Sequence, residues 1–154
     1  PAQVHCCDAS SLIQFRNAGL LTRLRRLALN GQLKVPSAIL GELNRRSEAA
    51  EQIARWNSAG QVVVDLARQP QALAQLARIE RTYGPRFRVG QTTYAGFWRG
   101  GADPTTKDSH VIAFASVNNW VVVTEDASIR GACFLENLEC VGWEELARRA
   151  GGLS

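Results

Sequence analysis

The most constraining feature of the sequence is a wholly apolar run, Val121–Val123, that recurs in weaker form at four other places. The weaker runs are short and β-rich: Val4–Cys7, Leu33–Val35, Val62–Val64 and Leu138–Val141. Strands without regular polar alternation are covered on both faces, which is typical of parallel sheets. Parallel strands need crossover connections, and the intervening segments are long enough to supply them as helices. The pattern predicts an α/β fold, a three-layer α/β/α arrangement around a central, mostly parallel sheet.

Helices are expected where apolar residues recur at helical spacing and the segment ends at a breaker. The expected helices are Ser10–Ala18, Leu20–Asn30, Pro36–Trp56, Pro70–Tyr83, Thr105–Asn118, Ser128–Phe134 and Trp143–Ala150. Residues 86–101 show no clear period, so no element is predicted there. We find no internal repeat and no second domain, so residues 1–154 are predicted to form a single domain.

The charge balance of the 154-residue chain is basic, with 18 Lys and Arg against 14 Asp and Glu, and all but two of the cations are Arg. Arg suits bidentate contacts to phosphate, so a polyanionic partner is expected, although a merely basic protein fits the balance equally well. The four cysteines lack zinc-site spacing and are expected to be buried free thiols. The chain has no signal-like start and no apolar run of ~18 residues, so we expect a cytoplasmic protein that does not enter a membrane.

Carboxylates follow two of the predicted strands. Asp8 comes directly after the first strand, and Thr124, Glu125 and Asp126 come directly after the strongest one. In open α/β sheets, ligands bind outside the carboxyl ends of the strands. If these two strands are neighbours, their terminal carboxylates face one crevice.

Two further acids lie near the start of predicted helices. Glu42 follows the Leu33–Val35 strand, and Asp108 precedes the Val121–Val123 strand. Glu42 could equally be a solvated side chain, and Asp108, three residues after Thr105, fits a capping box.

The acids after the strands also have a structural interpretation. Asp8 could cap the helix that begins near Ser10, and Asp126 could cap the helix that begins near Ser128.

Four carboxylates at one edge of a sheet repel each other, by about 4 kcal/mol for two charges ~4 Å apart at an effective dielectric near 20. Such a group must be partly protonated or must hold cations. Hard oxygen ligands select Mg²⁺ or Mn²⁺, ions that keep bound water and also bind substrate phosphates. The chemistry indicated is phosphodiester hydrolysis.

Three motifs resemble those of the PIN domain family. The start of the chain, Asp8-Ala-Ser-Ser-Leu-Ile, is similar to the family's opening motif, and Pro36-Ser-Ala-Ile-Leu-Gly-Glu-Leu is similar to its second. Asp108-Ser-His-Val-Ile-Ala-Phe-Ala followed by Val121-Val-Val-Thr-Glu-Asp resembles its C-terminal half. The resemblance extends from Val4 to about Trp143.

The resemblance implies a PIN-like fold and a metal-dependent endoribonuclease. The four acids would be catalytic residues and ligands of Mg²⁺ or Mn²⁺: Asp8, Glu42, Asp108 and Asp126. Ser10, Thr124 and Glu125 would orient these carboxylates or a metal-bound water. Many bacterial members of the family are VapC-type toxins that a small antitoxin inhibits, and many form homodimers, so an antitoxin partner, a homodimer and an RNA substrate are expectations from the resemblance.

Some alternatives remain open at this point. Asp103 competes with Asp108 for the third acidic position, and Glu125 competes with Asp126 for the fourth. The same metal chemistry would serve a DNA nuclease, and a PIN-like scaffold could also be a non-catalytic module that binds RNA or protein.

Residues 86–107 combine basic and aromatic side chains ahead of Asp108. Arg can bind phosphates and aromatic rings can stack on unpaired bases, so the candidate nucleic-acid-binding residues are Arg86, Arg88, Trp98, Arg99 and Lys107. The alternative is a loop that packs Phe97 and Trp98 into the core.

Overall fold

A computed structural model of the chain describes residues 3–43, 47–57, 61–98 and 107–152. The elements in chain order are β1 (His5–Cys7), α1 (Ala9–Asn17), α2 (Leu21–Leu29), β2 (Leu33–Pro36), α3 (Ser37–Glu42), α4 (Glu48–Trp56), β3 (Val63–Val64), the 3₁₀ turn η2 (Leu66–Arg68), α5 (Pro70–Tyr83), β4 (Phe87–Val89), β5 (Thr92–Tyr94), α6 (Asp108–Asn118), β6 (Val121–Val123), α7 (Ala127–Leu135), β7 (Cys140–Val141) and α8 (Trp143–Gly151).

The main sheet has five parallel strands in the order β3-β2-β1-β6-β7. The chain builds β1, β2 and β3 outward in one direction and then crosses back to place β6 and β7 on the other side of β1. The strand order therefore reverses between β1 and β6, where Cys7 pairs with Val123. Ligand sites of open α/β sheets lie at such a reversal, outside the carboxyl ends of the strands.

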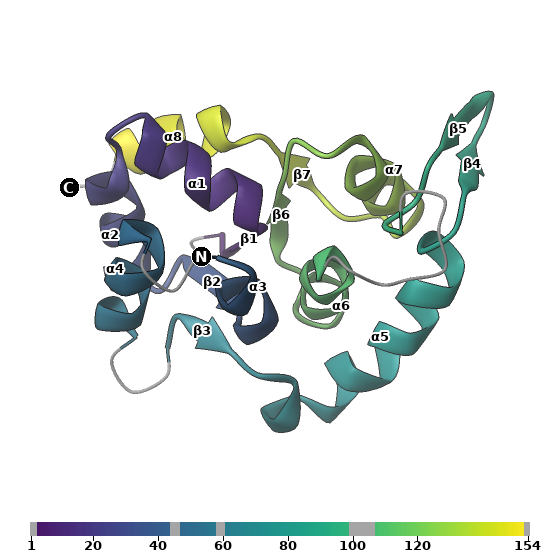
Figure 1. Cartoon of the computed structure of the whole chain (residues 1–154), viewed down its shortest axis with the longest axis horizontal. Coiled ribbons are helices and arrows are strands. Elements are labelled where there is room, and N and C mark those ends of the chain that lie inside the picture. The colour runs from purple at the N-terminus through teal and green to yellow at the C-terminus, as the bar shows by residue number, and fades with distance from the viewer. Residues whose placement is uncertain (1–2, 44–46, 58–60, 99–106, 153–154) are drawn as a thin grey trace.

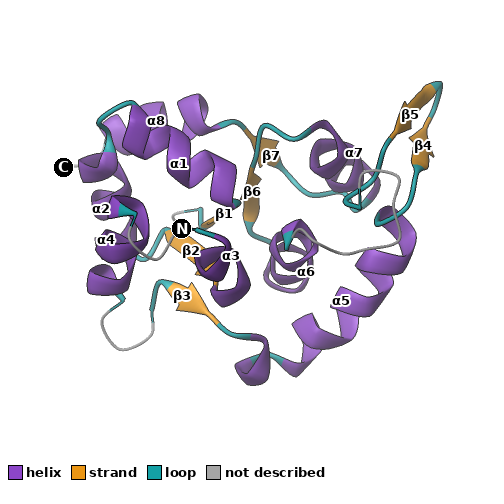
Figure 2. Ribbon diagram, viewed as in Figure 1, coloured by secondary structure: helices purple, strands orange, loops and turns teal. Residues whose placement is uncertain are grey.

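Helices cover both faces of the sheet, as Figures 1 and 2 show. Helices α1, α2, α4 and α8 pack on one another, and α5, α6 and α7 form a second group. The valines of β6 are buried between the layers, as a strand covered on both faces requires. The predicted three-layer α/β/α fold is confirmed. No helix of the described ranges combines the length and the apolar character that a membrane crossing requires.

The expected helix Pro36–Trp56 is instead two helices. Helix α3 ends at Glu42 because Leu43 has extended backbone angles (φ −69°, ψ 143°). A second helix, α4, begins after Ser47, whose side chain accepts a hydrogen bond from the Ala50 N–H. A local cap therefore overrides the continuous apolar periodicity on which the prediction of one helix depended.

Residues 87–94 form an antiparallel hairpin where no element was predicted. A two-residue turn joins the strands, and Gly90 has the positive φ (60°) that such turns need at their first central position. The hairpin projects from the end of α5 in Figure 1. Tyr94 holds it in place, because its ring stacks on Phe87 (5.2 Å between centroids) and lies where a side chain at Gly131 of α7 would otherwise be.

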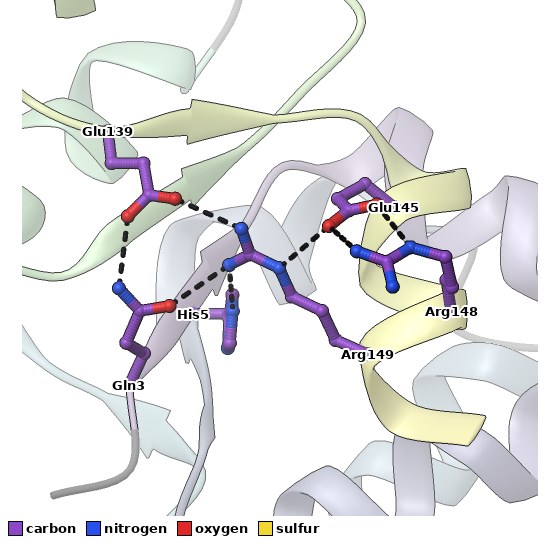
Figure 3. A network of polar contacts seen from close by, with 6 residues as sticks. All are labelled: Gln3, His5, Glu139, Glu145, Arg148 and Arg149. Carbon is purple, nitrogen blue, oxygen red and sulfur yellow. Dashed lines mark hydrogen bonds and ion pairs between the residues drawn. The ribbon is translucent and has the colours of Figure 1, made fainter. Parts of the chain in front are cut away.

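Arg149 of α8 forms hydrogen bonds at the amino-terminal ends of the strands (Figure 3). Its guanidinium donates hydrogen bonds to Glu139 (3.0 Å), Gln3 (3.1 Å) and the Nε2 atom of His5 (3.1 Å). Burial lowers the pKa of His5, so the neutral ring is favoured and its Nε2 can accept the bond. This network joins three parts of the chain at the end of the sheet opposite the strand carboxyl ends.

Candidate functional site

Asp8 lies at the carboxyl end of β1 and is 2 % exposed. Its backbone N–H donates to the Val123 carbonyl (3.2 Å), which continues the pairing with β6 by one residue. Its Oδ1 atom accepts from the Ser11 N–H (2.8 Å), so Asp8 is the N-cap of α1, as the structural interpretation predicted. The capping bond uses Oδ1 of the carboxylate, and Oδ2 makes a second contact.

Thr124 makes that second contact. It follows β6, is fully buried, and its hydroxyl donates to Asp8 Oδ2 at 2.5 Å. The same hydroxyl oxygen accepts the Asp126 backbone N–H at 3.0 Å. One threonine therefore joins two aspartates that are far apart in the sequence, and no helix-capping rule requires this link.

Asp126 is the N-cap of α7, because its Oδ1 accepts the Ile129 N–H at 3.0 Å. Its negative charge acts on Asp8. Burial raises the pKa of Asp8, the Asp126 charge adds to the increase, and hydrogen bonds from Thr124 and Ser11 oppose it. The two carboxylates are thus coupled across the β1–β6 boundary, as expected if their strands are neighbours.

Glu42 ends α3 and interacts with the first described residue before α6. Its Oε1 accepts a short hydrogen bond from the Lys107 backbone N–H. Partial burial raises the pKa of the Glu42 carboxyl, Lys107 opposes the increase, and the charge of Asp8 adds to it. Glu42 is therefore within electrostatic range of Asp8, and the Lys107 charge offsets part of its own.

Asp108 is the first residue of α6, where the dipole of the helix stabilises a negative charge. Helix α6 contacts α3, β1 and β6. Its N-cap is Lys107, which makes no side-chain capping bond, and Thr105 and the competing Asp103 lie outside the described residues. The choice between Asp103 and Asp108 therefore stays a prediction.

The auxiliary residues predicted from sequence lie in different surroundings. Ser10 is exposed, whereas the buried Ser11 contacts Asp8 and donates from its hydroxyl to the Val123 carbonyl (3.3 Å). The sequence pattern contains two adjacent serines and could not separate them. Glu125 contacts Arg130 (3.2 Å) and the Trp143 N–H (3.1 Å).

Among the described residues, Asp8 and Asp126 are the ones whose chemistry could hold a Mg²⁺ or Mn²⁺ ion. No group of three or more His, Cys, Asp or Glu gathers as a metal site within the described ranges. Mg²⁺ is commonly held by one or two carboxylates and completes its shell with water and substrate phosphates. The carboxylates of Asp8 and Asp126 are hard oxygen donors of the same charge, the kind of ligand that these ions prefer. Their mutual repulsion is the kind that a divalent cation relieves.

The basic and aromatic segment has a mixed arrangement. Arg86 and Arg88 are exposed at the hairpin, and Lys107 is exposed beside Glu42. Phe97 is buried, so core packing is correct for this residue. Trp98 is half-buried, with its ring against Gly84 on one side and lining a surface pocket with α5 on the other, and its contact with nucleic acid stays a prediction.

Arg99 lies outside the described residues.

Comparison with known proteins identifies a family. A family described as a domain of unknown function, DUF4411, matches residues 5–151, and the chain belongs to it. The match includes the candidate acids from Asp8 to Asp126. No curated protein matches the sequence.

Proposed function

We propose that this member of the DUF4411 family is a divalent-metal-dependent endoribonuclease of PIN-like type. The observation that carries the proposal is the Thr124 hydroxyl, which links Asp8 and Asp126 where the strand order reverses. Burial and the charge of Asp126 both disfavour ionisation of Asp8, and a bound cation would offset that cost. The resemblance of three sequence motifs to PIN domains supports the same activity.

Asp8 and Asp126 would hold the ion. Glu42, whose carboxyl is affected by the charge of Asp8, and Asp108, the first residue of α6, would act on bound water or substrate. Mg²⁺ or Mn²⁺ would lower the pKa of a bound water and shield charge on the phosphate. The chain's own contribution is orientation: the Ser11 N–H and the Thr124 hydroxyl fix both oxygens of Asp8. The Ile129 N–H fixes Asp126 in the same way.

For an antitoxin partner and a homodimer, the support is the family resemblance alone. Arg86, Arg88 and Lys107 are exposed cations that support binding of a polyanion. Nothing in these side chains selects a ribose 2′-hydroxyl, so DNA is included in the test as a competing substrate.

The test is cleavage of single-stranded RNA, structured RNA and DNA with Mg²⁺, Mn²⁺ or EDTA. We expect metal-dependent RNA cleavage that Asp8→Asn and Asp126→Asn abolish. Asn is as good an N-cap as Asp, so both variants should fold. Asp65→Asn is the matched control, because Asp65 caps a 3₁₀ turn after the outer strand β3 and should leave cleavage unchanged.

Full activity of both variants in EDTA would refute the mechanism. Metal-dependent cleavage of DNA alone would change the substrate class. Binding of RNA without cleavage of any substrate would favour the non-catalytic module.

A further inference from the structure

Glu125 lies between Thr124 and Asp126 in the sequence, and its side chain is hydrogen-bonded to α7 and α8. Its Oε1 accepts the Trp143 N–H at 3.1 Å and its Oε2 pairs with Arg130 Nη2 at 3.2 Å. Trp143 is the first residue of α8, whose N-cap position is Gly142 and has no side chain to cap the helix. Glu125 therefore supplies the missing cap from another element.

Arg130, on α7, contacts both Glu125 and the backbone of Thr124. Its Nη2 atom donates to the Thr124 carbonyl at 3.2 Å as well as to Glu125. Both side chains of the pair are about half exposed, so their attraction adds little to stability. Their importance is geometric, because Arg130 contacts the residue whose hydroxyl joins Asp8 to Asp126.

Gly142 shows how closely the carboxylate is seated. A Cβ atom at this position would lie 2.1 Å from Glu125 Oε1. The φ of Gly142 is −83°, which any residue can adopt, so close approach and not backbone freedom favours glycine here. Trp143 in turn packs edge-on against Phe15 of α1 (5.9 Å between centroids), the helix that Asp8 caps.

We propose that Glu125 and Arg130 are positioning residues that clamp the Thr124–Asp126 segment to the start of α8, with Gly142 leaving room for the carboxylate. The proposal rests on the proposed function, because the segment it fixes carries one of the two suggested metal ligands. Glu125 acts through Thr124 and Asp126 and does not contact the ion. This assignment differs from the alternative in which Glu125 replaces Asp126 as a ligand.

The first measurement is amide hydrogen exchange by NMR in the full chain without metal. In Glu125→Ala, we expect exchange at the Asp126 and Ile129 amides to be at least tenfold faster. The buried Ile112 amide of α6 should keep its rate, which separates local release from global unfolding. Unchanged rates at Asp126 and Ile129 would overturn the clamp.

Gly142→Ala is an independent perturbation of the same contact. The new methyl group displaces the far end of a flexible side chain, so the fold should persist while Glu125 leaves the Trp143 N–H. We expect the same local acceleration as in Glu125→Ala, with a smaller effect in Glu125→Gln, which keeps an acceptor oxygen. Glu144→Ala, which removes an exposed carboxylate from the same end of α8, is the control.

The second measurement is Mn²⁺ affinity, followed by the EPR signal of the free ion in the absence of RNA. Glu125→Ala and Gly142→Ala should bind Mn²⁺ at least fivefold more weakly than wild type and Glu144→Ala. Faster local exchange with Mn²⁺ affinity within twofold of wild type would overturn the positioning role. If wild type neither binds Mn²⁺ nor cleaves RNA, the proposed function fails, and the exchange rates still decide whether the clamp exists.

Discussion

Replacing Thr124 with Val tests the link between the two aspartates. Val has nearly the same shape, so the substitution removes the hydroxyl and little else. Asp8 loses a charge-assisted hydrogen bond of 2.5 Å, and the Asp126 N–H loses its acceptor. A hydrogen bond to a charged group contributes about 1.5–3 kcal/mol, and an unsatisfied buried donor costs about 1–3 kcal/mol. Since the two terms share one hydroxyl, we expect Thr124→Val to lower the free energy of unfolding by about 2–4 kcal/mol at pH 7.

The effect should depend on pH in a defined direction. Losing the Thr124 donor raises the pKa of Asp8 beyond the increase that burial already causes. A carboxyl whose pKa is raised in the folded state contributes stability at low pH that is lost as the pH rises through that pKa. The difference in unfolding free energy between wild type and Thr124→Val should therefore become smaller as the pH falls from 7 to 4.

Urea denaturation at both pH values measures the gap, and Thr124→Ser is the matched control. Ser keeps the hydroxyl and loses one methyl group, worth about 0.8 kcal/mol. If Thr124→Val is as stable as Thr124→Ser at pH 7, the hydroxyl does not link the aspartates in solution. A gap that widens toward pH 4 would contradict the assigned charge on Asp8.

Three further predictions concern other parts of the chain. Because burial lowers the pKa of His5, wild type should lose stability relative to His5→Gln as the pH falls from 7.5 to 5.5. If the melting temperatures of the two proteins fall by the same amount over this range, the prediction is wrong. Iodoacetamide at pH 7.5 should modify Cys140 before the other three thiols. A hydrogen bond from the Cys133 thiol lowers the pKa of Cys140, whereas burial raises the pKa of Cys6 and Cys7. Peptide mass mapping measures the labelling, and equal labelling of all four thiols would show that this is wrong. Substituting Arg86 and Arg88 with Ala should reduce the slope of log affinity against log salt for single-stranded RNA by about 1.4, and an unchanged slope would remove the hairpin from the binding surface.

Local patterns were sufficient for elements whose start and end signals lie in their own residues. Helix α5 has the predicted bounds, Pro70–Tyr83, because proline opens it and Gly84-Pro85 follows it. Strand β6 also has the predicted bounds, since three consecutive valines are suited to a strand buried on both faces. The hairpin at 87–94 was missed because its strands are half-exposed and short, although Gly90 next to Gln91 was an available turn signal.

The candidate site was predictable in part for the same reason. Asp8 follows an apolar strand directly and Asp126 comes three residues after another, so their place at the carboxyl ends is visible in the sequence. The choice of Ser11 over Ser10 depends on which face of α1 meets β6, and a nine-residue helix with weak amphipathicity does not reveal that face. The direction of Glu125 depends on the start of α8, which lies 18 residues further along the chain.

The sequence by itself determined the strands of the main sheet and most of the helices, but not the break between α3 and α4 or the β4–β5 hairpin. It could do so because caps, breakers and apolar spacing act over a few neighbouring positions. Only the tertiary structure decided that β1 lies beside β6, that Thr124 joins Asp8 to Asp126, and that Glu125 turns toward Trp143. These relations depend on contacts between residues up to 116 positions apart. Hydrophobic burial and hydrogen bonding bring such residues together only once the whole sheet has formed, so no local pattern encodes their distances.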